Sequence, residues 1–387
     1  NIDVQLADLG NINASFQNEQ PNFHKLEERF GNRVQSTSWN FSANGNLEKF
    51  APRSFSGMKV PITYSHSEFL ETPEYVANND IELDEAAAQA GRNAYLNAID
   101  NGASEEEAQA LAESAENQVR RRSEVVRVQD SWALTDVKLG IPVKHWLIEE
   151  TLNRLSFGYS YSQEFERSPL YEEKFNWMWR LNIKYGLNIP DILSISPLGF
   201  LTDSKVFNLY SKYKINFLPS NINLSLNMRR RRQTEQSRFL DYPSPVFRDF
   251  SADRSASFSW KFTENGFLNP IWDYNFSTRS TLVPFELNEL GRQRSGSELA
   301  DKILLNDGEI INLGLDNSHN QNVTFNLKPK FPDIAGISRF IDMSASFNTN
   351  YNWTDPLEAN PEIKDQAKSA SWNNNIRIYF IRLIYKC

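Results

Sequence analysis

Apolar and polar residues alternate one by one in many short segments of the chain. In the clearest segment the apolar residues are Phe175, Trp177, Trp179, Leu181 and Ile183, and most of the residues between them are polar or charged. Successive side chains of a β-strand point to opposite faces, so this segment predicts a strand with one aromatic and one polar face. Its length matches the roughly 9–11 residues with which a tilted strand crosses a membrane.

The same alternation recurs along the chain and predicts about twelve strands. Further candidates lie at 37–43, 58–64, 155–161, 222–228, 258–262, 272–276, 323–327 and 341–353. Residues 2–16 predict one strand that bends near Gly10, because a glycine inside a strand often marks a bulge. A soluble antiparallel sandwich also alternates in this way. The long apolar faces that end in Tyr or Trp favour instead a transmembrane barrel with aromatic girdles.

The expected connections are alternately short and long. Short turns with a proline lie at 44–57, 263–270 and 330–340, and long polar connections lie at 67–122, 232–254, 283–320 and 354–371. Outer-membrane barrels have short periplasmic turns and longer extracellular loops, so we expect the long set outside the cell, with a short extracellular hairpin at 166–172. The region 187–221 contains three prolines. Short and long connections alternate along the whole chain only if this region is a single periplasmic excursion.

Residues 76–122 predict a helical hairpin inserted in the first long connection, on the extracellular side. The apolar residues of its first helix are Leu83, Ala87, Ala90, Ala94 and Ala98, which recur at helical spacing. Asn101 and Gly102 end that helix, and Ser104 with Glu107 forms a capping box for the second. The apolar residues of the second helix are Ala108, Leu111, Ala112, Ala115 and Val119.

Composition narrows the class of protein. The chain has 387 residues, a net charge of -8, 40% hydrophobic and 13% aromatic residues. Its mean hydropathy of -0.55 excludes a helical membrane protein, whereas a barrel is compatible because only every second residue faces lipid. The only cysteine is Cys387, so we expect no internal disulfide and no cysteine-based metal site. The first residues read as the middle of a strand, which favours a fragment of a longer protein.

Candidate catalytic and metal-binding residues are few. The histidines are His24, His66, His145 and His319, and none has a second ligand at metal-binding spacing. Known nucleophile and phosphate-loop motifs are also missing from the sequence. We therefore expect no enzyme, metal or cofactor, and histidines that are exposed or line a lumen. Acidic residues near 84 and 105–107 lack calcium-loop spacing and are explained by helix starts.

The run Arg229–Arg232 is the strongest concentration of charge. One interpretation is a site for nucleic acid or heparin. The other is the end of a strand, where the arginines contact lipopolysaccharide or the lumen wall. We favour the second, and expect no nucleic-acid partner, because the chain is acidic overall and no aromatic residues interleave with the arginines.

The alternation assigns two sets of side chains to opposite faces. The lumen-facing candidates are Asn176, Arg180, Asn182, Lys184, Ser344, Asn348 and Asn350. The lipid-facing candidates are Phe175, Trp177, Trp179, Leu181, Ile183, Phe325 and Phe347. Inward side chains fill the interior of a small barrel, so the repeated Asn, Ser, Lys and Arg favour a wide, water-filled lumen.

Several phrases resemble the SprA/Sov family, the outer-membrane translocon of the Bacteroidota type IX secretion system. They are Leu6–Gly10, Asn46–Pro52 followed by Val60–Ile62, Glu71–Tyr75 followed by Asp80–Leu83, and Lys214–Ile222. The resemblance covers most of the chain in patches and fits the last residues, 379–387, least. It implies a channel that passes folded cargo proteins to the cell surface and is linked to gliding motility. It also implies three kinds of partner: a PorV-type shuttle barrel, a periplasmic plug and periplasmic accessory proteins.

Together these features predict an all-β fold, in which residues 1–387 are an internal segment of a much larger antiparallel transmembrane β-barrel in the outer membrane of a Gram-negative, Bacteroidota-like cell. Membrane lipid, lipopolysaccharide and secreted cargo are its expected contacts. Two alternatives stay open at this point. One is a complete smaller barrel, such as a porin or nutrient-uptake barrel, and the other is a soluble β-rich surface binding protein.

Overall fold

A computed structural model describes residues 1–21, 34–55, 57–77, 79–189, 194–200, 210–240, 244–304, 313–332, 343–356 and 368–379. These residues form two compact units. The first unit comprises Asn1–Val137, Gly158–Arg180 and Arg229–Asp249, and the second comprises Lys138–Phe157, Leu181–Met228 and Phe250–Cys387.

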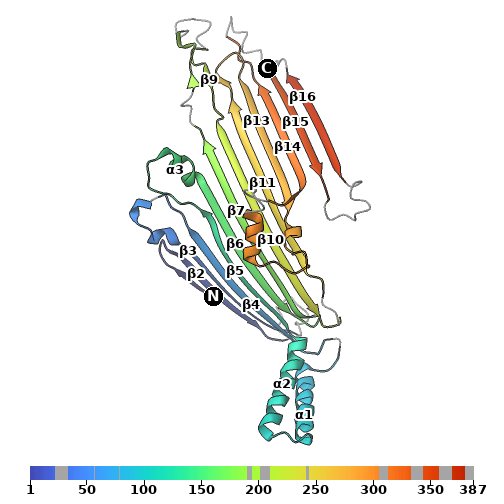
Figure 1. The fold of residues 1–387 in the computed structure, drawn as a ribbon. Helices are drawn as coiled ribbons and strands as arrows, with labels where there is room; N and C mark the ends of the chain where they lie inside the picture. Colours follow the sequence, from blue (N-terminus) through green and yellow to red (C-terminus); the bar gives the residue numbers. More distant parts are fainter. Residues whose placement is uncertain are drawn as a thin grey trace, which may run out of the picture. The chain divides into compact units, whose positions relative to one another are not determined.

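Thirteen strands form one sheet, in which strands that follow one another along the chain are also neighbours in the sheet (Figure 1). They are β1 (Ile2–Gln5), β2 (Gly10–Glu19), β3 (Val34–Asn46), β4 (Pro61–Pro73), β5 (Val125–Val137), β6 (Leu155–Arg167), β7 (Tyr171–Asn188), β10 (Asn221–Ser237), β11 (Phe247–Lys261), β13 (Pro270–Thr281), β14 (Leu315–Leu327), β15 (Ser344–Thr354) and β16 (Ser369–Tyr379). The order begins at β1 and ends at β16, so the sheet is not closed. The predicted antiparallel, mostly β architecture is confirmed. The described strands form an open sheet and not a closed barrel.

A second, small sheet and a few short helices occupy the connections. The small sheet has the order β12-β9-β8, with β8 at Ser194–Ile195, β9 at Lys214–Asn216 and β12 at Thr263–Glu264. It lies partly within the predicted excursion 187–221. The short helices are η1 (Leu47–Phe50), η2 (Arg53–Phe55), α3 (Trp146–Glu150), η3 (Leu152–Arg154), η7 (Val283–Phe285) and α4 (Gly296–Leu304). Within the described ranges, none of the helices has both the length and the apolar character needed to cross a membrane.

The start of the chain corrects one expectation. Residues 2–16 are not one bent strand, because β1 folds back onto β2 and pairs Ile2 with Ala14. The reversal is closed by a hydrogen bond from the Leu6 amide to the Gly10 carbonyl, 2.8 Å long. Ala7 and Gly10 adopt φ angles of 49° and 152°. The turn was not predicted because its Ala-Asp-Leu sequence lacks the usual Asn-Gly or Asp-Gly signature of a hairpin. The alternation of apolar and polar residues also runs through the turn without a break.

All four long connections are shorter than expected. β4 continues to Pro73 inside the predicted connection 67–122, and β16 begins at Ser369 inside 354–371. The predicted loop 232–254 is largely strand, since β10 extends to Ser237 and β11 begins at Phe247. In the same way, β14 begins at Leu315, inside the predicted loop 283–320. The turn between β6 and β7 agrees with the hairpin expected at 166–172. Residues 357–367 of the predicted loop 354–371 lie outside the described residues.

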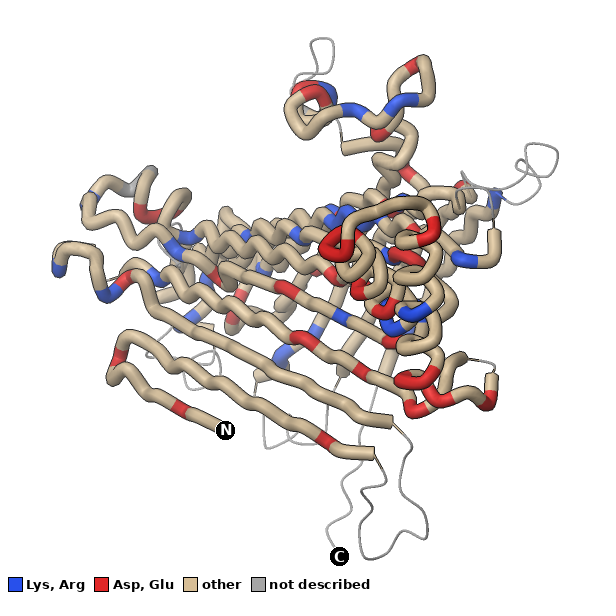
Figure 2. Tube along the Cα trace, turned by 90° about the horizontal axis from the view of Figure 1, so that it is seen from below, with Lys and Arg blue, Asp and Glu red and all other residues tan. Residues whose placement is uncertain are grey.

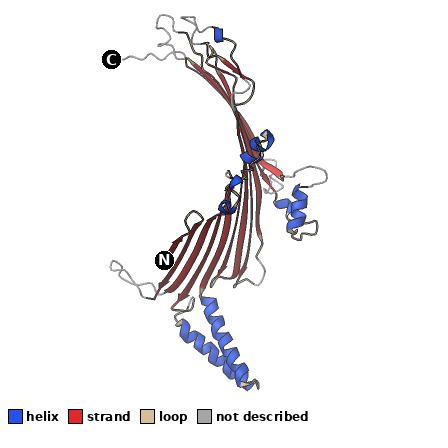
Figure 3. Ribbon diagram, turned by 90° about the vertical axis from the view of Figure 1, so that its left-hand side faces the viewer, coloured by secondary structure: helices blue, strands red, loops and turns tan. Residues whose placement is uncertain are grey.

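The predicted helical pair is confirmed as α1 (Leu83–Asp100) and α2 (Glu105–Ser123), which extend from the ends of the strands (Figure 3). The capping box is present: the Glu107 amide donates to Ser104 Oγ at 3.3 Å, and the Ser104 amide donates to Glu107 Oε2 at 3.0 Å. Two positions of the predicted apolar stripe differ. Gly91 is buried where Ala90 was expected, and Leu111 is 52% exposed. The helices approach through small residues, and a Cβ at Gly91 would lie 2.4 Å from Glu116 Oε1.

This close approach makes the helical pair sensitive to side-chain volume. Ala108 is fully buried between the helices, so Ala108→Leu should destabilise the pair by about 1–3 kcal/mol through overpacking. Ala110 lies on the exposed side of the same helix, and Ala110→Leu is the matched control. Amide hydrogen exchange in α1 and α2 measures the difference. Equal protection in the two variants would contradict the packing described above.

Candidate functional site

The register places the aromatic residues of successive strands side by side on one surface of the sheet, called here the aromatic face. In the first unit Phe16 pairs with Trp39, and Tyr64 pairs with Trp132. Residues directly opposite in an antiparallel pair share a face. Ring contacts extend this face to β6 and β7: the centroids of Trp132 and Tyr159 are 5.1 Å apart, and those of Tyr159 and Trp179 are 6.3 Å apart.

The second unit has an aromatic face of the same kind. Phe258 packs edge-on against Trp272 at 4.9 Å, and Trp272 pairs with Phe325. Phe325 in turn pairs directly with Phe347, and the two are 38% and 37% exposed. The structure thus brings together the predicted lipid-facing residues of β14 and β15. That this surface contacts lipid stays a prediction.

The opposite surface, called here the polar face, is linked by side-chain amides. In the first unit Asn176 accepts from Arg231 at 2.9 Å, and in the second unit Asn182 donates to Asn227 at 2.5 Å. In the second unit, Asn348 donates to Asn322 and Thr324 at 3.0 and 2.9 Å, and Asn350 donates to Asn320 at 3.5 Å. The other lumen-facing candidates are Arg180 and Lys184, which are exposed, and Ser344, which is half-buried. Such a face offers hydrogen bonds to water and few apolar contacts.

Charged residues are sparse along the first strands of the sheet, β1–β3. Figure 2 shows few charges along the first strands, whereas several mark the helical pair and the connections. In β3, no position carries Asp, Glu, Lys or Arg. A charged group on the aromatic face near these first strands is therefore a local exception.

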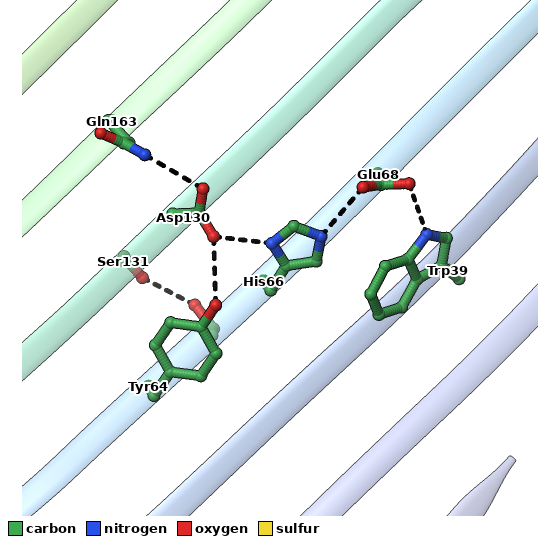
Figure 4. A network of polar contacts seen from close by, with 8 residues as sticks. Trp39, Tyr64, His66, Glu68, Asp130, Ser131 and Gln163 are labelled. Atoms are coloured by element: carbon green, nitrogen blue, oxygen red, sulfur yellow. Dashed lines mark hydrogen bonds and ion pairs between the residues drawn. The ribbon is translucent and has the colours of Figure 1, made fainter.

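One such exception is a polar network on the aromatic face of β3–β6 (Figure 4). His66 Nδ1 lies 2.6 Å from Asp130 Oδ1, and His66 Nε2 lies 3.3 Å from Glu68 Oε1. The Trp39 indole donates to Glu68 at 2.7 Å. Gln163 and Tyr64 donate to Asp130 at 3.1 and 3.2 Å. The network links four adjacent strands and satisfies two carboxylates on an otherwise aromatic surface.

The network does not assemble hydrolytic chemistry. Both ring nitrogens of His66 face carboxylate oxygens, and an ionised carboxylate only accepts hydrogen bonds. The imidazole can donate to both carboxylates at once only in its cationic form. The nearby hydroxyls of Ser65 and Ser131 are 2.6 Å apart, but they belong to the polar face. A base whose two nitrogens are engaged, with the serines on the other side of the sheet, does not activate a nucleophile. The arrangement is a hydrogen-bonded network of one histidine and two carboxylates.

His145 is exposed as expected, but His66 and His319 correct the expectation that the histidines are exposed or line a lumen. His66 is only 16% exposed at its side chain and lies on the aromatic face, so it neither is exposed nor lines the polar face. His319 is on the aromatic face of the second unit, with its Nδ1 2.7 Å from Thr278 Oγ1 and its ring 6.3 Å from that of Trp353. His24 lies outside the described residues. Among the described residues, no group of three or more His, Cys, Asp or Glu is placed to hold a metal ion.

The arginine run is divided between the two faces. Arg229 pairs with Asp249, and Arg231 contacts Asn176, so these two lie on the polar face. Arg230 lies over the Trp177 ring at 5.2 Å, on the aromatic face. The run is not at a strand end as expected, since β10 continues to Ser237. Aromatic residues do accompany the arginines, but they come from β7 and β11, which sequence spacing does not reveal.

A polar pocket of about 600 Å³ lies where β7 begins and β10 ends, in the first unit. It is lined by Glu172, Glu173, Thr234, Glu235, Gln236, Ser237, Arg238, Leu240, Ser244 and Val246. Arg238 donates to the Ser168 carbonyl at 3.0 Å. Burial lowers the pKa of Arg238, while the charge of Glu172 raises it and those of Arg122 and Arg167 lower it. No signal in the sequence pointed to this pocket, because its lining residues come from segments that are far apart.

The fold therefore defines an extended antiparallel sheet with one aromatic and one polar face. Residues 1–87 match the SprA_N family model, described as a motility related/secretion protein. The matched part contains β1–β4 and the start of α1, together with all but the last of the phrases that carried the resemblance. The expected resemblance is confirmed over these residues, and the family described is not a family of enzymes. No curated protein matched the chain in a sequence search.

Proposed function

We propose that this chain forms part of the wall of a protein-conducting channel in the outer membrane, the translocon of type IX secretion, which is also linked to gliding motility. The match of residues 1–87 to a motility and secretion family supports a function in secretion and motility. The two-faced sheet supports the more specific proposal that the chain forms part of a channel wall. The aromatic face contacts lipid and the amide-rich polar face lines the passage.

The exposure of the aromatic face carries the proposal. Trp39 and Trp132 in the first unit, and Phe325 and Phe347 in the second, are each 37–38% exposed on a face that has no second large sheet against it among the described residues. A soluble sandwich buries one face of each sheet against the other. A contiguous apolar surface of this kind marks a contact with membrane or protein. Lipid is the contact that suits strands of this length.

The polar face suits the passage of folded proteins. Its Asn, Ser and Thr side chains bond to one another, as in Asn348 with Asn322, and so offer few apolar groups to a passing surface. Secreted cargo, a PorV-type shuttle barrel, a periplasmic plug and periplasmic accessory proteins are the partners we propose. Lipid and lipopolysaccharide would cover the other side.

Deletion of the gene in the producing organism tests the proposal. We expect large folded proteins to accumulate in the periplasm and vanish from the cell surface, and the protein itself to be extracted from the outer membrane only with detergent. Re-expression of the intact gene should restore secretion. Normal secretion combined with loss of small-solute uptake would identify a porin or nutrient-uptake barrel instead. Extraction without detergent would identify a soluble surface protein.

A further inference from the structure

Five large apolar side chains are exposed on and beside the small sheet of the second unit, and are called here the apolar tip. Each is 39–54% exposed, and they are Ile195, Phe217, Leu218, Phe267 and Leu268. They come from two connections, one between β7 and β10 and the other between β11 and β13, which β9 and β12 bring together (Figure 1). Single exposed apolar residues are normal on a protein surface, whereas a group of them marks an interaction site.

The turn that carries Phe267 has a fixed geometry. The Gly266 amide donates to Asn269 Oδ1 at 2.8 Å, and Asn269 Nδ2 donates back to the Gly266 carbonyl at 2.9 Å. The Tyr213 ring packs so closely on Gly266 that a Cβ there would lie 2.4 Å from it. The Phe267 ring itself packs edge-on against Phe331 at 5.5 Å. An apolar group held in place in this way loses little conformational entropy when a partner binds.

Three exposed lysines are attached to the same turn by their backbone. The Lys330 amide donates to the Phe267 carbonyl at 2.9 Å. The Lys328 carbonyl accepts from a side chain of the turn at 3.2 Å, and the Lys212 carbonyl accepts from Asn265 at 3.4 Å. The lysine side chains therefore start from positions around the apolar tip.

The charge of these lysines is not neutralised within the part of the chain that the structure describes. None of the three forms an ion pair there. The carboxylate of the small sheet, Glu264, already lies 3.6 Å from Lys261 Nζ and is opposite Lys214 in the register. An exposed positive surface of this kind favours a partner of negative charge.

The apolar tip lies beyond the aromatic face and is not part of it. Trp260 pairs with Trp272, and Phe262 stacks on Trp260 at 4.5 Å. These are the last rings of the aromatic face before β12 begins at Thr263. Girdles of aromatic residues mark the level at which a membrane strand leaves the apolar layer. A membrane that covers the aromatic face would therefore leave the apolar tip in the aqueous phase, where a protein can reach it.

We propose that the apolar tip and its three lysines form a docking surface for an acidic protein segment that carries apolar side chains. The apolar side chains of the segment pack against Phe267 and its neighbours, and its carboxylates pair with the lysines around them. An apolar centre with a charged rim is the usual composition of a protein interface. The proposal rests on the proposed function, because the membrane location is what places the apolar tip outside the bilayer.

The test introduces the photoreactive residue benzoylphenylalanine at position 267 of the full-length protein in the producing organism. Illumination joins this side chain to the molecule that contacts it, and mass spectrometry identifies the joined segment. We expect a protein segment with apolar residues and an excess of Asp and Glu. The same photoreactive residue in place of Leu315, which is 46% exposed at the far end of β14, is the positional control and should not join to that segment.

The contribution of the lysines is measured with K212Q/K328Q/K330Q in the same experiment. One exposed ion pair changes an affinity by about twofold, so the loss of three should lower the yield of the joined product about eightfold. If this triple variant fails to assemble, each single Lys→Gln variant should still lower the yield about twofold.

The matched control is R92Q/R121Q/R122Q, which removes the same number of exposed positive charges from the helical pair and should leave the yield within about twofold of the parent. A lipid joined at position 267 would overturn the proposal, and so would a basic segment, the absence of a protein product, or a yield that does not depend on the three lysines. Extraction of the protein without detergent would contradict the membrane location itself. A protein that needs detergent but is joined only to lipid contradicts only the docking surface.

Discussion

Leu181→Arg is expected to prevent stable assembly of the sheet in a lipid bilayer. Leu181 follows Trp179 by two residues in the middle of β7 and continues its aromatic face. An arginine at the lipid-facing midplane of a membrane strand costs about 2–4 kcal/mol. A loss of that size is a large part of the stability of a folded protein. Urea titration of the chain refolded into lipid vesicles measures the change in the free energy of unfolding.

Asn182→Arg is the matched control, because it introduces the same side chain one residue further on. Asn182 lies on the polar face and donates to Asn227, and loss of that bond should cost only about 1 kcal/mol. The new guanidinium meets water and neighbouring amides there. Equal destabilisation by the two variants would contradict the assignment of the faces, and with it the proposal that lipid covers the aromatic side.

The alternating strands were predictable because apolar residues usually lie on one face of a strand and polar residues on the other. Strands were missed where a polar residue lies on the aromatic face. β5 was not predicted, since Asp130 interrupts the apolar series of Val126, Val128 and Trp132. β16 was missed for the same reason, because Asn374 stands between Trp372 and Ile376 and instead accepts from the Trp372 indole. In both strands a polar residue on the aromatic face is satisfied by a neighbour that periodicity does not identify.

The extents of β10 and β11 show a related limit. Beyond Met228, β10 carries arginines and other polar residues on both faces, so alternation disappears although the strand continues to Ser237. Backbone pairing needs no apolar side chain. The helical pair was easier to predict, because the capping box of Ser104 and Glu107 acts within one turn.

The polar network of Figure 4 depends on contacts between distant parts of the chain. Trp39 and Glu68 are 29 residues apart, and His66 and Asp130 are 64 apart. Their meeting is set by the register of β3, β4 and β5, and a shift of one residue would place them on opposite faces. The faces were therefore predictable from sequence, whereas the partners on each face were not.

Gly10→Ala is expected to disrupt the pairing of β2 with β3 at the edge of the sheet. Gly10 has a φ of 152°, and a Cβ there would lie 1.9 Å from the backbone oxygen of Asn44. A backbone conformation that suits only glycine costs other residues about 1–3 kcal/mol, and the clash with a backbone atom adds to it. The clash cannot be relieved by a side-chain rotation, so the strand itself must move.

Gly45 provides the control, because it is the direct partner of Gly10 in the register. A Cβ at Gly45 would lie 3.4 Å from Ile62 Cγ2, which is ordinary contact, so Gly45→Ala should change stability by less than about 1 kcal/mol. Hydrogen exchange of the Asn46 amide, which bonds to the Leu9 carbonyl at 2.8 Å, measures the local effect. Faster exchange in the Gly10 variant alone is the expected result. Equal exchange in the two variants would mean that the turn after β1 adapts without loss, and that its glycine is not required by the backbone.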